Sequence, residues 1–510
     1  MIHPQPLVLA LDIGTTSTKA GAYAVDGSLV ASASSGYPLL TPHPGYAVQE
    51  PDAILAAVIE AAQRVVADVG ADRIAGVSFS SAMHSLLGLD ADLDPLTPVI
   101  TWGDTRADRQ AESLRSGARG LALHRRTGTP VHPMSPLVKL IWFRETEPKL
   151  HESVAFWAGI KDWVLARLCG ALVTDHSLAS ATGLMDIHTL RWDPEALALA
   201  GVTAERLPEL VPTRHVLPGL TAGAVDAMGL PASVPVVVGA GDGPLANLGV
   251  GAVHPGVAAC SIGTSGALRV LVDRPVVDPR GGVFCYALTE DRWVIGGAIN
   301  NGGATLDWVR DLVAPELERG DETELLALAA RAHAGSGGLI MLPYLLSERA
   351  PHWSALPTGA YIGLTRAHAR EHHVRAAVEG VCLQLGLVLG SMREAGLVVT
   401  QVRATGGVMR SELWRSILAA TLDMRLDFAE GPEGSGFGAA LLGMDALGLI
   451  DSIDVAADLI PVTDQVTPDP ADAAVYRQLQ PVFDELYDRL VPTFQSLRRL
   501  EPMLPIGLEP

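Results

Sequence analysis

A turn rich in glycine and hydroxyl residues lies in the segment LVLALDIGTTSTKAGAYAVDGSLV, residues 7–30. The turn begins at Gly14 and continues with three hydroxyl residues and a nearby lysine: Thr15, Thr16, Ser17 and Lys19. Successive backbone N–H groups at such a turn form a concave nest that holds phosphate oxygens. The flanking residues favour strands, whereas a P-loop is followed by a helix, so the segment predicts a phosphate-binding hairpin.

The hairpin pattern occurs a second time in the chain. LALDIGTTS at residues 9–17 is echoed by AACSIGTSG at residues 258–266, where the turn residues are Gly263, Thr264 and Ser265. An apolar strand precedes each turn, and ALRVLV follows the second. The repeat predicts two related domains that face each other with their phosphate loops on one cleft. The alternative is a chance match, since the motif is short.

Two aspartates follow apolar strands and suit the chemistry of phosphoryl transfer. That reaction needs a carboxylate to accept the hydroxyl proton and a metal ion to bridge the phosphates. Asp242, between two glycines in VPVVVGAGDGPLA, suits the base, and Asp12 suits the metal side. The second hairpin carries Ser261 where the first carries Asp12. For each aspartate the alternative is a turn residue that accepts a hydrogen bond from its own backbone.

The same glycine-rich stretch also fits a loose dinucleotide-binding pattern, Gly241-x-Gly243-x-x-Ala246, directly after a strand. Pro244 stands inside this pattern, and Gly249 shortens the helix that would follow. The sequence has no acidic residue at the distance where such folds hold a ribose. We therefore do not expect a dinucleotide site.

Composition limits the class of protein. The 510 residues carry a formal charge of −20, so nucleic acid is an unexpected partner. The four cysteines are far apart in apolar surroundings, which predicts buried free thiols in a reducing compartment: Cys169, Cys260, Cys285 and Cys382. MIHPQP lacks the pattern of a leader, and no uninterrupted apolar run is long enough to span a membrane. We expect a cytoplasmic protein without a membrane partner.

The order of the expected elements indicates a layered α/β fold. A helix with apolar residues at helical spacing should begin near Asp52 and end at Gly70, and residues 74–80 form the next strand. The length predicts two domains, residues 1–250 and 251–510, with residues 105–230 as an elaboration of the first. Residues 476–497 predict a packing helix whose apolar face carries Val482, Phe483, Leu486, Tyr487, Leu490 and Phe494.

The pairing of two hairpin loops resembles the actin-like (ribonuclease H-like) ATPase superfamily, and the motifs resemble the FGGY family of carbohydrate kinases over residues 7–495. These motifs are DIGTTSTKA, ITWGDTRA, HPMSPLVKLIW, GAGDGPLANLGVG, SIGTSGAL, LPYLLSERAPHW and ATGGVMRSELW. The resemblance implies ATP and Mg²⁺ in the cleft, Asp242 as the base, and Asp12 with Asp242 at the metal. It also implies that both loops line the phosphates and that Gly406 and Gly407 lie beside adenosine.

Segments around the expected sugar site, such as SFSSAMHSLLGLD and DHSLASATGLMDIHTLRWD, resemble the gluconate kinases of this family. The resemblance implies transfer of phosphate from ATP to the C6 hydroxyl of D-gluconate. The expected substrate residues are Met83, His84, Trp102, Asp104, Arg106, Lys161 and Asp242. Gluconate is an anion, so its pocket should offer a cation, with Lys161, Arg106, Lys139 and His84 as candidates. For His84, a structural role is the alternative.

Two alternatives remain at this level. The substrate could be xylulose or another polyol, or the chain could be a catalytically silent, sugar-responsive nucleotide-binding protein. Intact Asp12, Asp242 and both loops argue against the silent protein. The sequence leaves the oligomeric state open, with a homodimer as one option.

Overall fold

The structure of the protein, a computed structural model, describes residues 5–318, 320, 322–429 and 434–500. Residues 1–4, on which part of the leader prediction rests, lie outside this description. The chain divides into two compact units. Unit 1 comprises Met1–Val257, Val270–Ile295 and Glu430–Pro461, and unit 2 comprises Ala258–Arg269, Gly296–Ala429 and Val462–Pro510. Segments from the second half of the sequence therefore pack with the first.

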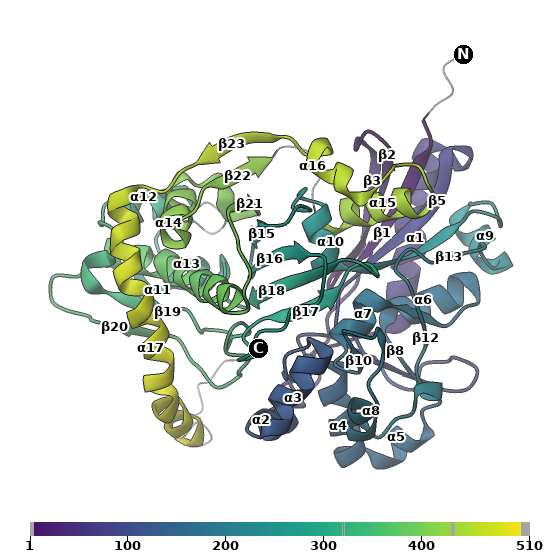
Figure 1. The fold of residues 1–510 in the computed structure, drawn as a ribbon, viewed down its shortest axis with the longest axis horizontal. Coiled ribbons are helices and arrows are strands. Elements are labelled where there is room, and N and C mark those ends of the chain that lie inside the picture. The colour runs from purple at the N-terminus through teal and green to yellow at the C-terminus, as the bar shows by residue number, and fades with distance from the viewer. Residues whose placement is uncertain (1–4, 319, 321, 430–433, 501–510) are drawn as a thin grey trace. The chain divides into compact units, whose positions relative to one another are not determined.

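A six-stranded sheet forms the centre of unit 1 (Figure 1). Its strand order is β13 (Val216–Leu217), β14 (Val236–Gly241), β5 (Ile74–Ser81), β1 (Leu7–Ile13), β2 (Ser17–Ala24) and β3 (Leu29–Gly36). β1 and β2 form the predicted antiparallel hairpin, while β14, β5 and β1 run parallel. Residues of β1 are buried on both faces, in agreement with its unbroken apolar run.

Helices cover both faces of this sheet. α1 (Pro51–Val69) begins next to the predicted Asp52 and ends at Gly70, whose φ of 88° favours glycine. α1 packs in the same core as Leu7, Leu9 and Leu11. The alternate residues of β1 meet α15 (Ser435–Ala446), because a Cβ on Gly443 would touch Val8 and one on Gly436 would approach Asp12. Since successive strand residues face opposite sides, α1 and α15 cover opposite faces.

The middle of the chain adds several helices to unit 1. The sequence analysis expected residues 105–230 to be an elaboration of the first domain, and they do belong to unit 1. The helices of this segment are α2 (Asp108–Arg115), α3 (Ala118–Thr127), α4 (Pro136–Thr146), α5 (Pro148–Ser153), α6 (Ile160–Cys169), α7 (His176–Ala181), α8 (Pro194–Ala200) and α9 (Ala222–Met228). Unit 1 also contains short strand pairs: β4 (Val48–Gln49) with β7 (Val99–Ile100), β6 (Leu87–Leu89) with β8 (Phe156–Ala158), β9 (Val173–Asp175) with β12 (Glu209–Val211), and β10 (Met185–Asp186) with β11 (Arg191–Trp192). α10 (Asp242–Leu248) and α16 (Ala456–Leu459) also belong to unit 1.

A seven-stranded sheet contains the main strands of unit 2. Its order is β17 (Phe284–Ala287), β18 (Trp293–Ile299), β16 (Gly266–Val272), β15 (Val257–Ile262), β21 (Gln401–Thr405), β22 (Leu426–Ala429) and β23 (Val462–Val466). A separate pair joins β19 (Ile340–Leu342) and β20 (Ala360–Ile362). The helices of unit 2 are α11 (Ala304–Val313), α12 (Thr323–Ala329), α13 (Arg370–Glu394), α14 (Glu412–Leu422) and α17 (Pro470–Leu500).

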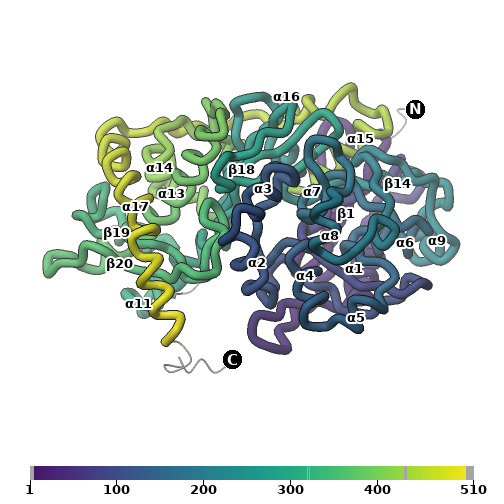
Figure 2. The backbone as a smooth tube through the Cα atoms, turned by 60° about the horizontal axis from the view of Figure 1, so that its bottom comes forward, coloured from purple at the N-terminus to yellow at the C-terminus, as the bar shows by residue number. Residues whose placement is uncertain are grey.

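The C-terminal helix α17 lies beside α13 and α14 (Figure 2). It contains the predicted residues 476–497 and buries Phe483 and Phe494 in a core with Leu342 and Tyr344. The prediction was wrong for Val482, which is 48% exposed and so does not belong to the packing face.

α13 is long and apolar enough to cross a membrane by length and composition alone. Its most apolar window is 89% buried inside the structure, however, as in the core helix of a globular domain. It also carries Arg375 and Glu379, which pair with each other at 2.8 Å. The length and apolar composition of α13 are therefore explained by its position as a core helix of unit 2.

Candidate active site

Three parallel strands of unit 1 bring the candidate residues to one edge of the sheet. Asp12 on β1 and Ala240 on β14 both pair with Ser80 of the intervening strand β5. Neighbouring strands are about 4.8 Å apart, so the ends of β1 and β14 are separated by roughly 10 Å. Asp12 and Asp242 thus leave the sheet at the same edge, as ligand-binding residues of α/β sheets commonly do.

One carboxylate oxygen of Asp12 accepts a hydrogen bond, whereas the other has no partner in the part of the chain that the structure describes. The Ser435 hydroxyl, at the start of α15, donates a hydrogen bond to Asp12 Oδ2 at 2.8 Å. Asp12 Oδ1 is buried and has no hydrogen-bond partner among the described residues. Burial raises the pKa values of Tyr23 and Tyr37 to about 12, and the negative charge of Asp12 contributes in the same direction. An oriented carboxylate with an unused oxygen suits a hard cation such as Mg²⁺.

The carbonyl groups of the first loop are tied down by residues of unit 1. The Tyr37 hydroxyl donates to Gly14 O at 2.7 Å, and the Tyr37 N–H donates to Thr16 O at 3.0 Å. The Gln49 amide donates to Thr15 O at 2.5 Å. The backbone N–H groups of Thr15 and Thr16 have no partner within the described part of the chain. The loop therefore presents donors and occupies its acceptors, as an anion nest requires.

Lys19 and Ser17 continue the loop into β2. Lys19 is exposed and pairs across the hairpin with Asp12, so both side chains project from the same face of the sheet. The indole N–H of Trp102 donates to the Thr15 hydroxyl oxygen at 2.9 Å. A predicted substrate residue and a predicted phosphate-loop residue are thus in direct contact.

Asp242 is the first residue of α10 and follows the last residue of β14. The Gly243 N–H donates to Asp242 Oδ1 at 2.7 Å. A Cβ on Gly241 would lie 2.8 Å from the sulfur of Met83, so glycine allows the chain to pass this side chain. α10 has only seven residues and ends before Gly249. This confirms the prediction that Gly249 shortens the helix, which was one reason not to expect a dinucleotide site.

The predicted substrate loops lie next to these strands. His84 has a φ of 66°, its Nδ1 lies 2.8 Å from Ala181 O, and its ring meets the edge of Tyr286. Asp104 is fully buried and accepts hydrogen bonds from Arg106 Nε and Nη2, both at 2.8 Å. The Arg106 guanidinium also lies 3.8 Å from the ring centre of Tyr46. Asp104 and Arg106 thus form a fixed, bidentate pair.

The two candidate lysines are both inside the core. Lys139 donates to His84 O at 2.8 Å and to Thr101 O at 2.7 Å, and burial lowers its pKa to about 7. Lys161 is 0% exposed and pairs with Asp175 at 2.5 Å. Because its ammonium already has a buried carboxylate partner, this position argues against the expectation that Lys161 receives a substrate carboxylate.

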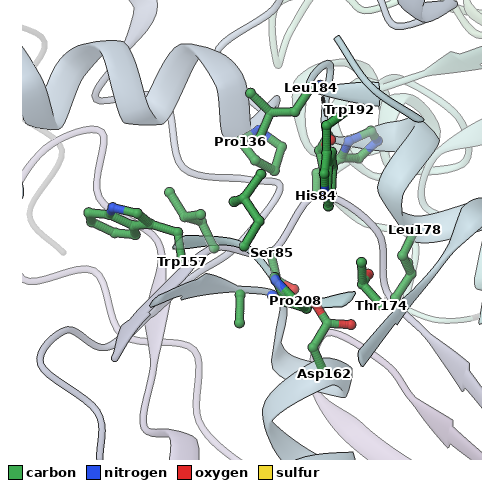
Figure 3. Close-up of a pocket in the computed structure, with 15 residues that line it drawn as sticks. His84, Ser85, Pro136, Trp157, Asp162, Thr174, Leu178, Leu184, Trp192 and Pro208 are labelled. Atoms are coloured by element: carbon green, nitrogen blue, oxygen red, sulfur yellow. Dashed lines mark hydrogen bonds between the residues drawn. The ribbon is translucent and has the colours of Figure 1, made fainter. Parts of the chain in front are cut away.

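His84 and Ser85 line a pocket of unit 1, together with Pro136, Trp157 and Asp162 (Figure 3). In Figure 3, Asp162 and Thr174 lie on the side of this pocket away from Pro136 and Leu184. Asp162 Oδ2 accepts from the Gly159 N–H at 2.7 Å at the start of α6. Burial raises the pKa of Asp162 to about 7. The pocket therefore contains a carboxyl group that is poorly solvated.

The second loop and the glycines predicted for adenosine come together within unit 2. The Gly303 N–H donates to Gly263 O at 2.7 Å, and the Gly302 N–H donates to Thr264 O at 3.0 Å. Ser265 O accepts from the Gly263 N–H at 2.8 Å. The carbonyl groups of this loop are thus occupied by backbone donors, whereas at Gly14 the side chains of Tyr37 and Gln49 supply two of the donors.

The contact between β15 and β21 brings Gly406 to this loop. Gly406 has a φ of 106°, and a Cβ there would lie 2.1 Å from Ile262 O. A Cβ added at Gly407 would have no atom within 4 Å, and Gly407 is exposed. The backbone at Gly406 thus approaches the second loop more closely than any other residue type permits.

Sequence reasoning missed several residues that organise these loops. They are Tyr37, Gln49, Asp175, Ser177, Gly302, Gly303 and Ser435. The motif GSGFGAALLG, which begins α15, was a visible signal for Ser435, but the contact of Ser435 with Asp12 depends on the tertiary fold. No group of three or more His, Cys, Asp or Glu residues suited to a metal occurs in the described ranges.

The chain is similar to known carbohydrate kinases. Residues 7–249 match the FGGY family of carbohydrate kinases, N-terminal domain, and residues 258–447 match its C-terminal domain. A gluconokinase of Bacillus subtilis (strain 168) is 42% identical over 94% of this chain and 95% of its own length.

Two crystal structures have similar folds. A gluconate kinase from Lactobacillus acidophilus is 32% identical and matches with a TM-score of 0.92 over 97% of this chain and all of its own. A ligand-bound xylulose kinase from the same organism is 33% identical, with a TM-score of 0.92 over 96% of this chain and all of its own. The fold is therefore shared by kinases with different sugar substrates.

Proposed function

Since the chain belongs to the FGGY family of carbohydrate kinases, we propose that it transfers the γ-phosphate of ATP to D-gluconate, giving 6-phospho-D-gluconate and ADP. The family assignment makes the chain a phosphotransferase that acts on a sugar hydroxyl, with ATP as co-substrate. The two-domain, actin-like α/β fold agrees with this assignment. The choice of gluconate is supported by the 42% identity to a gluconokinase.

Asp242 acts as the general base in this proposal. Its carboxylate takes the proton of the C6 hydroxyl while O6 attacks the γ-phosphorus, and the bond from that phosphorus to the β,γ-bridging oxygen breaks. The observation that carries the assignment is the register of β1, β5 and β14, which delivers Asp242 to the same sheet edge as Asp12 and the first loop. Gly241 supports it further, because it lets the chain pass close to Met83.

Mg²⁺ fits the residues at Asp12. The buried Oδ1 lacks a partner among the described residues, and Ser435 orients the carboxylate through Oδ2. Magnesium sites of phosphoryl-transfer enzymes commonly use one or two carboxylates together with waters and substrate phosphates, so a larger acidic cluster is not needed. Asp12 and Asp242 would hold the ion, which supplies charge neutralisation at the phosphates when bound.

The two loops with occupied carbonyl groups bind the phosphates of ATP in this proposal. In unit 1 the N–H groups of Thr15 and Thr16 are available as donors, and Lys19 and Ser17 lie beside them. In unit 2, Gly263, Thr264 and Ser265 form the second loop, and Gly406 and Gly407 bind the adenosine side. The support is that the same local construction occurs twice in one chain.

The sugar acid binds near Met83, His84, Trp102, Asp104 and Arg106. Of the candidate cations, Lys139 and Lys161 are directed at buried partners within unit 1. Arg106 uses Nε and Nη2 for Asp104, and its Nη1 has no hydrogen-bond partner in the described ranges. We therefore assign the carboxylate of gluconate to Arg106, with His84 as a further contact.

A screen of ADP release with gluconate, xylulose, ribulose and glycerol tests the substrate. We expect the highest kcat/KM with gluconate. The alternative within the family is a xylulose kinase, favoured by the equal TM-score of the xylulose kinase structure. A higher kcat/KM with xylulose would replace the gluconate proposal, and sugar binding without ADP release would instead support the silent binding protein.

A further inference from the structure

β14, the strand that leads to Asp242, contains a bulge. Val236 and Val237 pair with Val77 and Ser78 of β5, and the register then resumes with Ala240 opposite Ser80. Two residues, Val238 and Gly239, therefore stand opposite Phe79 alone. Gly239 has a φ of 77°, and a Cβ there would lie 1.8 Å from Phe79 O. Such a bulge bends the strand and changes the direction in which its last residues run.

A buried ion pair holds this bulge. Lys161, on α6, donates from Nζ to Val238 O at 2.9 Å and to Asp175 Oδ2 at 2.5 Å. Both charged side chains are 0% exposed. The ammonium thus fixes the carbonyl of a bulge residue that lies four positions before Asp242.

The same carboxylate also supports the end of β14. Asp175 Oδ1 accepts from the Leu178 N–H at 2.9 Å and so caps the N-terminus of α7. Ser177, in the first turn of α7, accepts from the Gly241 N–H at 3.2 Å through its hydroxyl oxygen. Gly241 immediately precedes Asp242. β14 is therefore held at Val238 and at Gly241 by one connected set of contacts.

We propose that Lys161 and Asp175 are positioning residues that set the direction in which Asp242 leaves β14. This inference rests on the proposed role of Asp242 as the base. A buried ion pair often contributes no more to stability than apolar residues of similar size would. We therefore attribute to this pair the role of fixing the direction of β14. A reacting group displaced by about 1 Å can lose about a hundredfold in rate, which makes such support effective.

The main test is the double variant Lys161→Met with Asp175→Asn. It removes both charges, roughly preserves volume, and lets the asparagine carbonyl oxygen continue to cap α7. We expect kcat to fall about tenfold to a hundredfold, while KM for ATP stays within about threefold, because the phosphate loops are untouched. Ser177→Ala, which removes only the contact to Gly241, should lower kcat by a smaller factor in the same direction.

Two control variants separate positioning from stability. Val164→Ala truncates a fully buried residue of α6 and should lower the melting temperature with kcat unchanged at a temperature where it remains folded. Arg126 forms an ion pair at 2.8 Å with Asp193, whose side chain caps the N-terminus of α8. Arg126→Met breaks this pair and should also leave kcat unchanged.

Asp242→Asn, measured in parallel, distinguishes failure of the inference from failure of the proposed function. If Asp242→Asn is inactive and the folded double variant keeps kcat within twofold of the natural chain, the inference is overturned. If the double variant does not fold, Ser177→Ala takes its place in the test, and a kcat within twofold of the natural chain then overturns the inference. If Asp242→Asn itself retains normal turnover, the proposed base is wrong and the positioning role falls with it.

Discussion

Ser435 donates a hydrogen bond to Asp12 at 2.8 Å, although the two residues lie 423 positions apart in the sequence. Ser435 is the first residue of α15, a helix from the second half of the chain that packs on the sheet of unit 1. The contact orients one carboxylate oxygen and leaves Oδ1 without a protein partner among the described residues. The contact with Ser435 thus fixes the direction of the Asp12 carboxylate within unit 1.

Replacement of Ser435 by alanine should raise the Mg²⁺ concentration needed for half-maximal activity. The hydroxyl contributes a hydrogen bond to a charged acceptor, which is worth about 1.5 to 3 kcal/mol, so we expect an increase of about tenfold or more. Titration of activity with MgCl₂ at saturating ATP measures it. Ser28→Ala is the matched control, because Ser28 donates to the exposed Asp26 at 2.7 Å. An equal shift in both variants would contradict the prediction.

Asp242→Asn should lower turnover by at least about two orders of magnitude, the usual contribution of a positioned base. Asparagine has nearly the same size and cannot accept the hydroxyl proton at neutral pH. ATP binding, measured by calorimetry, should persist because neither phosphate loop changes. Near-normal turnover would remove Asp242 from the role of base.

Local features of the fold could be predicted from the sequence. The hairpin of β1 and β2 follows from Gly14 between two strand-forming segments, and α1 ends at Gly70 as its periodicity indicated. α17 contains the whole predicted tail helix but begins earlier, at Pro470. These features are local because turn residues and apolar spacing act within a few positions.

Features that depend on tertiary contacts could not be predicted in this way. Lys161 was a candidate for the sugar carboxylate because the charge of a lysine is visible in the sequence, whereas its burial against Asp175 is not. The bulge at Val238 and the hydrogen bond from Ser435 to Asp12 likewise arise from strand register and helix packing. The residue types of the candidate site are therefore visible in the sequence, whereas the contacts of these residues depend on the tertiary fold.

Arg106→Met should raise KM for gluconate more than KM for a neutral polyol. The loss of a charged hydrogen bond corresponds to about tenfold to a hundredfold in affinity. Arg106→Lys keeps a positive charge beside Asp104 but lacks the planar fork, so its effect should be intermediate. Arg109→Met is the control, because the Arg109 side chain is 86% exposed on the neighbouring helix α2. Equal increases of KM for the acid and the polyol would remove Arg106 from carboxylate recognition.

Gly406→Ala should weaken ATP binding and lower stability. An added Cβ would lie 2.1 Å from Ile262 O, so the backbone beside the loop at Gly263 must move. We expect KM for ATP to rise about tenfold or more, by analogy with other small displacements at reacting groups. Gly396→Ala is the control for backbone strain alone, because Gly396 has a φ of 85° with no atom near its Cβ position. A normal KM for ATP in folded Gly406→Ala would contradict the proposed nucleotide site.

Asp162→Asn should make the stability of the protein less dependent on pH. Burial raises the pKa of Asp162 from 3.8 to about 7, so the folded chain retains its proton where the unfolded chain has lost it. This contribution to stability is complete below pH 3.8 and is lost as the pH rises to about 7, because ionising the buried group then costs free energy. Asparagine stays neutral and can keep the contact to the Gly159 N–H.

Urea unfolding at pH 5 and pH 8 measures this effect. As the pH rises from 5 to 8, the free energy of unfolding of Asp162→Asn should increase relative to that of the natural chain, by an amount on the order of 1 to 3 kcal/mol. Asp68→Asn, at an exposed position of α1, is the control and should show no such change. If the difference between Asp162→Asn and the natural chain is the same at both pH values, Asp162 is ionised in the folded protein throughout, and its pocket is better solvated than its burial indicates.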